Sequence, residues 1–88
     1  MEAFLKKLQL LPVGYTRVIF NHKVYGLTRS NFNKGKSFKV YAQELGGNNF
    51  ISFNYYTIHG KGALKPCEMP LQKVTYFIEN IIIQGTVL

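Results

Sequence analysis

Two stretches in the middle of the chain alternate between apolar and polar side chains, and this pattern constrains the fold more than any other feature. The first covers Lys36 to Leu45 and the second covers Phe50 to Ile58. A period of two is typical of strands that bury one face of a sheet. The turn-forming segment Gly46-Gly47-Asn48-Asn49 separates them. The sequence therefore predicts a β-hairpin with one apolar and one polar face.

Closing this hairpin at Gly47-Asn48 predicts its register. Apolar residues then meet on one face and polar or amphipathic residues on the other, and a slip of one residue would destroy this match. The predicted pairs are Ala42 with Phe53, Val40 with Tyr55, Tyr41 with Asn54, and Lys39 with Tyr56.

Helical periodicity marks both ends of the chain. Glu2 to Leu11 has an apolar stripe at helical spacing and is stopped by Pro12. The second helix is predicted to start at Pro70, a residue suited to the first helical position, and to stop at Gly85. Its stripe is the strongest periodic signal in the chain and consists of Leu71, Val74, Phe77, Ile78 and Ile81.

The remaining segments predict further strands. Tyr15 to Thr28 is rich in β-branched and aromatic residues and is interrupted at Asn21-His22, which favours a hairpin whose turn has two residues or more. Asn31 to Gly35 is predicted as a polar loop, and Ala63 to Lys65 as a short edge strand after a turn at Gly60-Lys61-Gly62. We therefore expect residues 1–88 to form a single α+β domain: a four- to five-stranded antiparallel meander with an N-terminal and a C-terminal helix packed on one face.

The chain is strongly basic, with 11 Lys and Arg against 4 Asp and Glu, which gives a formal net charge of +7. Such a charge attracts nucleic acid, anionic lipid or acidic proteins, or simply favours solubility, and it does not choose among them. Cys67 is the one cysteine, so an internal disulfide is excluded and a reducing cytoplasm is expected. The N-terminal segment is too short and too charged for a signal peptide or a membrane span, so no membrane partner is expected.

Catalytic and metal-binding patterns are weak. The four carboxylates, at Glu2, Glu44, Glu68 and Glu79, are scattered over different elements and predict no acid pair. His22, His59 and Cys67 are too few for a predicted metal site, and no cofactor is expected. Cys67 remains a possible reactive thiol if Lys65 or a helix N-terminus lowers its pKa, with a small buried side chain as the alternative.

The polar face of the central hairpin carries the most functional information. Tyrosines offer stacking platforms for unpaired bases, and lysines neutralise phosphates. Single-stranded DNA or RNA is therefore the predicted partner, without enzymatic activity. High β-propensity alone also explains exposed tyrosines, and the apolar segment Ile81 to Leu88 or a sheet edge leaves a homodimer or protein-interaction module open. The candidate contacts are Lys36, Lys39, Tyr41, Asn54 and Tyr56, together with Arg17, whose face the sequence does not assign.

Six segments spread over nearly the whole chain form a recognisable pattern. They are Leu11-Pro12-Val13-Gly14-Tyr15, Tyr25-Gly26-Leu27-Thr28, Gly35-Lys36-Ser37-Phe38-Lys39-Val40-Tyr41, Glu44-Leu45-Gly46-Gly47-Asn48, Phe50-Ile51-Ser52-Phe53-Asn54-Tyr55-Tyr56 and Leu64-Lys65-Pro66-Cys67-Glu68-Met69-Pro70. These segments resemble a family of small, largely uncharacterised bacterial proteins. The family has sometimes been catalogued as peptide methionine sulfoxide reductase, which implies reduction of oxidised methionine with a thiol donor. The order of strands and helix is also similar in architecture to single-strand-binding domains of the PC4 and Pur type.

Overall fold

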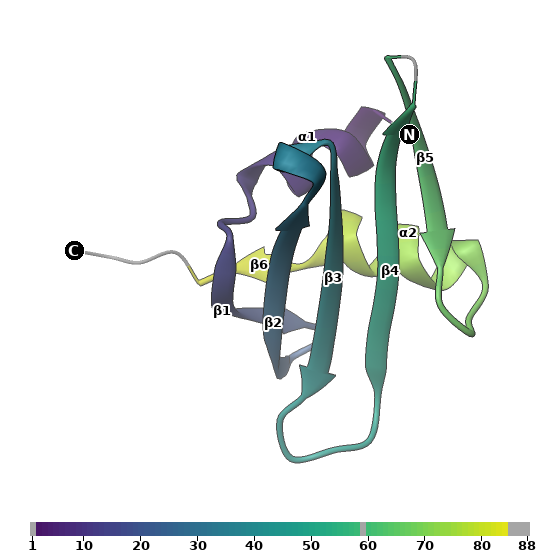
Figure 1. Ribbon diagram of the computed structural model, residues 1–88. Helices are drawn as coiled ribbons and strands as arrows, with labels where there is room; N and C mark the ends of the chain where they lie inside the picture. The colour runs from purple at the N-terminus through teal and green to yellow at the C-terminus, as the bar shows by residue number, and fades with distance from the viewer. Residues whose placement is uncertain (1, 59, 85–88) are drawn as a thin grey trace.

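A computed structural model describes residues 2–58 and 60–84 and shows one antiparallel sheet with two helices (Figure 1). The sequence-based prediction of an α+β fold is confirmed. The elements, in chain order, are α1 (Glu2–Leu10), β1 (Gly14–Phe20), β2 (Lys23–Phe32), the short 3-10 helix η1 (Asn33–Gly35), β3 (Ser37–Glu44), β4 (Phe50–Ile58), β5 (Lys61–Pro66), α2 (Leu71–Asn80) and β6 (Ile82–Ile83).

The sheet has six strands in the order β5-β4-β3-β2-β1-β6. Strands β1 to β5 form the predicted meander, but the predicted number of four to five strands is too low. The additional strand is β6, which follows α2 and pairs with β1 at the far edge. Its residues belong to the β-branched run Ile81-Ile82-Ile83, and β-branched side chains favour extended backbone. The helix therefore ends at Asn80, well before Gly85, which lies outside the described residues.

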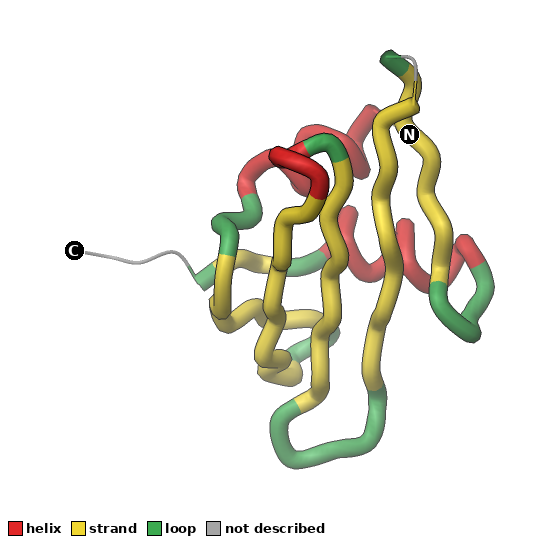
Figure 2. Tube along the Cα trace, in the orientation of Figure 1, coloured by secondary structure: helices red, strands yellow, loops and turns green. Residues whose placement is uncertain are grey.

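Both helices pack on the same face of the sheet, as predicted (Figures 1 and 2). The Phe4 ring of α1 lies 6.0 Å from the Phe53 ring of β4, and the Phe77 ring of α2 lies 5.0 Å from the Tyr25 ring of β2. Burying each such large apolar side chain contributes about 1.5–3 kcal/mol to folding. The largest fully buried side chains are Phe4, Val18, Leu27, Val40, Ile51, Phe53, Val74, Phe77, Ile78 and Ile81.

The first hairpin closes with a two-residue turn. Asn21 and His22 both adopt positive φ, at 54° and 65°, and Phe20 pairs directly with Lys23. Two consecutive left-handed residues form the turn whose twist matches that of the flanking strands. The longer alternative for this turn is therefore wrong. The predicted loop at Asn31 to Gly35 is also too long, because Asn31 and Phe32 continue β2 and pair with β3.

The predicted register of the second hairpin is wrong by two residues. Tyr41 pairs with Ser52 instead of Asn54, and Lys39 pairs with Asn54 instead of Tyr56. A shift of two residues keeps every side chain on its predicted face, because side chains alternate with a period of two. The pairing of Ala42 and Val40 shifts in the same way, to Ile51 and Phe53.

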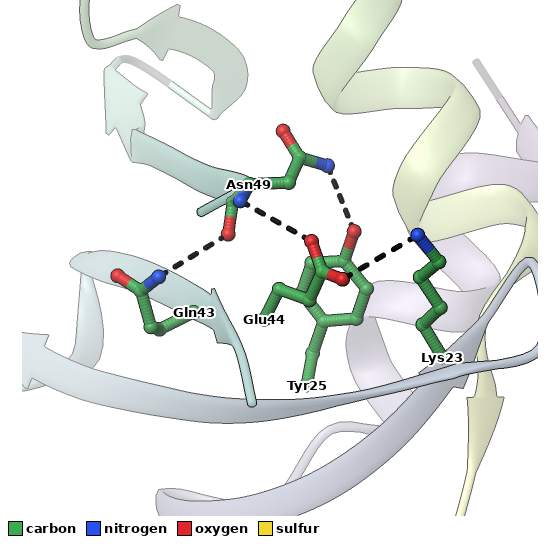
Figure 3. A network of polar contacts seen from close by, with 5 residues as sticks. All are labelled: Lys23, Tyr25, Gln43, Glu44 and Asn49. Atoms are coloured by element: carbon green, nitrogen blue, oxygen red, sulfur yellow. Dashed lines mark hydrogen bonds and ion pairs between the residues drawn. The ribbon is translucent and has the colours of Figure 1, made fainter. Parts of the chain in front are cut away.

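Asn49 explains why the loop is wider than a two-residue turn (Figure 3). Its carbonyl oxygen accepts a hydrogen bond of 2.8 Å from the backbone N–H of Glu44, and its own N–H donates to Glu44 Oε1 at 3.2 Å. Its side-chain amide donates to the buried Tyr25 hydroxyl at 2.8 Å. The loop therefore closes between Glu44 and Asn49, outside the predicted turn at Gly47-Asn48.

Candidate nucleic-acid interface

The face of the sheet opposite the two helices is called here the outer face. Its residues are identified by alternation, because Val18, Val40 and Phe53 are fully buried beneath the helices and their chain neighbours point the other way. Tyr41, with 40% of its surface exposed, and Tyr56, with 37%, lie on this face. The predicted residues Lys39 and Asn54 share it and stand opposite each other.

The tyrosine on β3 is held in a defined position. The Tyr41 hydroxyl donates a 2.7 Å hydrogen bond to Gln43 Oε1, and the Tyr41 ring stacks on Phe50 with 6.1 Å between centroids and 28° between planes. These contacts restrain the ring while a large part of its surface remains accessible to solvent. An ordered ring loses little conformational entropy when a flat ligand stacks on it.

Arg17, whose face alternation could not assign, belongs to the outer face. It stands opposite Gly26, next to the buried Val18, and its side chain is exposed. Lys36 lies between η1 and β3, at the end of the sheet, where its carbonyl oxygen accepts a hydrogen bond from the Thr57 N–H. The structure thus places five of the six predicted contacts on one face, and the sixth at the end of that face.

The outer face carries cations but, among the described strands, no carboxylate. Among the described strands the one acidic residue is Glu44, which points to the helix side and forms a 3.6 Å ion pair with Lys23 (Figure 3). Glu2 and Glu79 belong to the helices, and Glu68 lies in the turn before α2. Within residues 14–58 and 60–84, no carboxylate of a strand therefore neutralises the cations of the outer face, and an anionic ligand meets an attractive field.

Two further residues of the outer face were missed by the sequence analysis. Lys65 on β5 is exposed and stands opposite Asn54, so β4 separates it from Lys39. Tyr15 on β1 is 61% exposed, and a Cβ atom at Gly26 would lie 2.5 Å from its hydroxyl oxygen. The Tyr15 ring therefore covers Gly26. For Lys65 the available signal was a basic residue in a predicted edge strand, and for Tyr15 it was an aromatic residue at the start of a predicted strand.

Cys67 adjoins the outer face at the end of β5. Its backbone N–H donates to the Ser52 carbonyl oxygen at 2.9 Å, and its half-buried sulfur accepts a 3.6 Å contact from Asn54 Nδ2. Sulfur is a weak acceptor, and this contact orients the Asn54 amide on the outer face. Cys67 is thus a neighbour of the predicted contacts.

In the described part of the chain, no three His, Cys, Asp or Glu side chains lie close enough to hold a metal ion. His22 is exposed in its turn, and His59 lies outside the described residues. Within residues 2–58 and 60–84, no helix is long and apolar enough to cross a membrane.

Comparison of the chain with protein-family models, with curated proteins and with solved structures gave no match.

Proposed function

We propose that this protein binds unpaired stretches of DNA or RNA through the outer face of its sheet. The observation that carries the proposal is the placement of both helices on the opposite face, which leaves Lys39, Tyr41 and Tyr56 exposed together. Exposed rings stack on the faces of unpaired bases, and neighbouring cations neutralise the phosphates. A duplex keeps its bases paired and stacked, so it offers no base face to these rings.

The test is the salt dependence of binding to a fluorescently labelled oligonucleotide of about 12 nucleotides, a length within the usual range for such sites. If Arg17, Lys36 and Lys39 each neutralise one phosphate, a plot of log affinity against log salt has a slope of about −2, because each contact on a single strand adds about −0.7. Lys39→Gln should make the slope shallower by about 0.7. Tyr41→Ser should weaken binding roughly 5- to 150-fold, the range measured for loss of one stacked base.

Matched controls come from the helices. Lys6 on α1 and Tyr76 on α2 are exposed and belong to the layer that covers the other side of the sheet. Lys6→Gln and Tyr76→Ser make the same chemical changes away from the outer face and should leave the affinity unchanged. Absence of binding at tens of micromolar protein, or equal losses in the control variants, would refute the proposal.

A second candidate function, homodimerisation, is favoured by one aliphatic cluster. Ile82 of β6 is 63% exposed and pairs with Ile19, which in turn pairs with Val24. The three side chains form a cross-strand row at one end of the outer face. A dimer through this row predicts a molar mass that rises with concentration, and Ile82→Thr should abolish the rise. A monomer mass at all concentrations would contradict it.

A further inference from the structure

Side chains of similar chemistry line up across the strands of the outer face. Lys39, Asn54 and Lys65 stand directly opposite one another on β3, β4 and β5, and we call them the cationic row. Rings lie on both sides of it. Tyr15 and Tyr41 lie at a level two residues further along the strands in one direction. They are aligned with each other through Thr28 of β2.

A second line of rings lies two residues from the cationic row in the other direction along the strands. Phe32 of β2 and Tyr56 of β4 are aligned through Ser37 of β3, and both rings are exposed. Strand geometry sets the spacing, with about 7 Å between successive rows and about 5 Å between neighbouring strands. The level of the cationic row, on β3 to β5, therefore lies between one aromatic row on β1 and β3 and another on β2 and β4.

This arrangement distinguishes two orientations of a bound strand. A single strand carries its phosphates along one line and its bases to the side of that line. Laid along β3, it would pass over Tyr41, then Lys39, then Ser37, so that its phosphates would meet rings and cations in turn. Laid across the strands, its phosphates follow the cationic row and its bases reach an aromatic row. In the second orientation, phosphates contact cations and bases contact rings.

Resting on the function proposed above, we propose that the unpaired strand crosses the β-strands, and that Lys65 and Tyr15 belong to the binding site. Lys65 then neutralises a phosphate close to the one at Lys39, since the two lysines are about 10 Å apart across two strand spacings. A phosphate contact at Lys65 then makes the salt slope steeper by about 0.7. Both residues lie on strands that a ligand running along β3 and β4 would leave untouched.

Tyr15 has the form of a stacking platform. Its ring atoms Oη, Cε1 and Cζ all lie within 3.1 Å of the position of a Cβ atom on Gly26, so the ring rests on the β2 backbone. Gly26 is buried although it is on the outer face, whereas Tyr15 remains 61% exposed. The hydroxyl end of the ring is therefore held over the sheet, while most of the side chain remains accessible to a base.

The experiment compares binding of the same labelled oligonucleotide to Lys65→Gln, Tyr15→Ser and the wild type. Crossing predicts that Lys65→Gln makes the salt slope shallower by about 0.7, as Lys39→Gln does, and that Tyr15→Ser weakens binding about 5-fold or more. Tyr15→Phe keeps the ring and should bind like the wild type, which separates loss of stacking from damage to the fold. Lys6→Gln and Tyr76→Ser again serve as controls.

Failure of this inference is distinguishable from failure of the proposed function. If the wild type binds and depends on Lys39 and Tyr41, while Lys65→Gln and Tyr15→Ser bind normally, the strand does not cross the sheet and the inference is overturned. If the wild type does not bind the oligonucleotide at all, the proposed function itself fails. Equal losses in Tyr15→Phe and Tyr15→Ser would also overturn the role of the Tyr15 ring.

Discussion

Replacing Arg29 by methionine removes the side chain that fastens α1 to the sheet. Arg29 lies on β2, on the helix-covered face, and its Nη1 donates to the carbonyl oxygens of Leu8 at 3.3 Å and Leu11 at 3.0 Å. Leu8 lies in the last turn of α1, where its carbonyl oxygen also accepts from the Leu11 N–H at 3.2 Å, and Leu11 directly follows the helix, where carbonyl groups lack helical partners. The guanidinium carbon also lies 4.2 Å from the centre of the Phe38 ring. One side chain thus satisfies the helix end and packs on the core.

The expected loss follows from these contacts. Each hydrogen bond from a charged donor contributes about 1.5–3 kcal/mol, and the cation–π contact about 0.5–1 kcal/mol. Partial exposure and the desolvation of the guanidinium offset part of this sum, so the free energy of unfolding should fall by about 2 kcal/mol. For a domain of this size the melting temperature then falls by roughly 8–16 °C.

The assay is thermal unfolding followed by circular dichroism. Arg29→Lys should lie between the wild type and Arg29→Met, because lysine keeps the charge but not the planar fork of donors. Burial lowers the pKa of Arg29. Desolvation of the charged Arg29 guanidinium therefore lowers the free energy of unfolding at every pH at which the guanidinium is charged. This cost disappears only when the pH rises through the folded-state pKa, in the strongly alkaline range. The difference in the free energy of unfolding between the wild type and Arg29→Met should therefore be constant from about pH 5 to 9. A methionine variant that melts within about 2 °C of the wild type would refute this account.

Three further predictions concern the loop and the outer face. Asn49→Ala leaves the buried Tyr25 hydroxyl without its donor and should cost about 1–2 kcal/mol in urea unfolding, part of which Tyr25→Phe should restore; an unchanged midpoint would contradict the role of Asn49. Gly26→Ala should displace the Tyr15 ring, since the new Cβ would meet its flexible end, and should weaken oligonucleotide binding while the melting curve stays cooperative; unchanged binding would count against the platform. Cys67→Ser should leave the dissociation constant unchanged, and loss of binding would instead give the thiol a direct part in it.

Alternation in the sequence was sufficient to predict the faces of the central hairpin but not its pairing. A register shift of two residues preserves the face of every side chain, so the pattern of Lys39, Tyr41, Asn54 and Tyr56 fits both registers equally well. The register depends on Asn49, whose partner Tyr25 is 24 residues away in the chain. A contact of that range leaves no local signal in the sequence.

Similar physical causes explain why the face of Arg17 was not assigned and why Lys65 and β6 were missed. Arg17 is followed by Val18 and Ile19, both apolar, so alternation does not show which of them is buried. The face of Lys65 follows from its pairing with Asn54, and a short edge strand does not define its own register. β6 forms because the edge of β1 is available to pair with it, which is a property of the folded sheet and not of the Ile81-Ile82-Ile83 run alone.

The central claim, that the outer face is the ligand-binding surface, is tested most directly by two side-chain amide signals in a nuclear magnetic resonance titration with an unlabelled oligonucleotide. Asn54 lies on the outer face, with its Nδ2 directed to Cys67, whereas Asn80 lies at the end of α2, with its Nδ2 donating to the Tyr76 carbonyl oxygen at 2.8 Å. The account predicts that the Asn54 amide signals shift progressively and saturate while those of Asn80 stay in place. Shifts at Asn80 with none at Asn54 would contradict it.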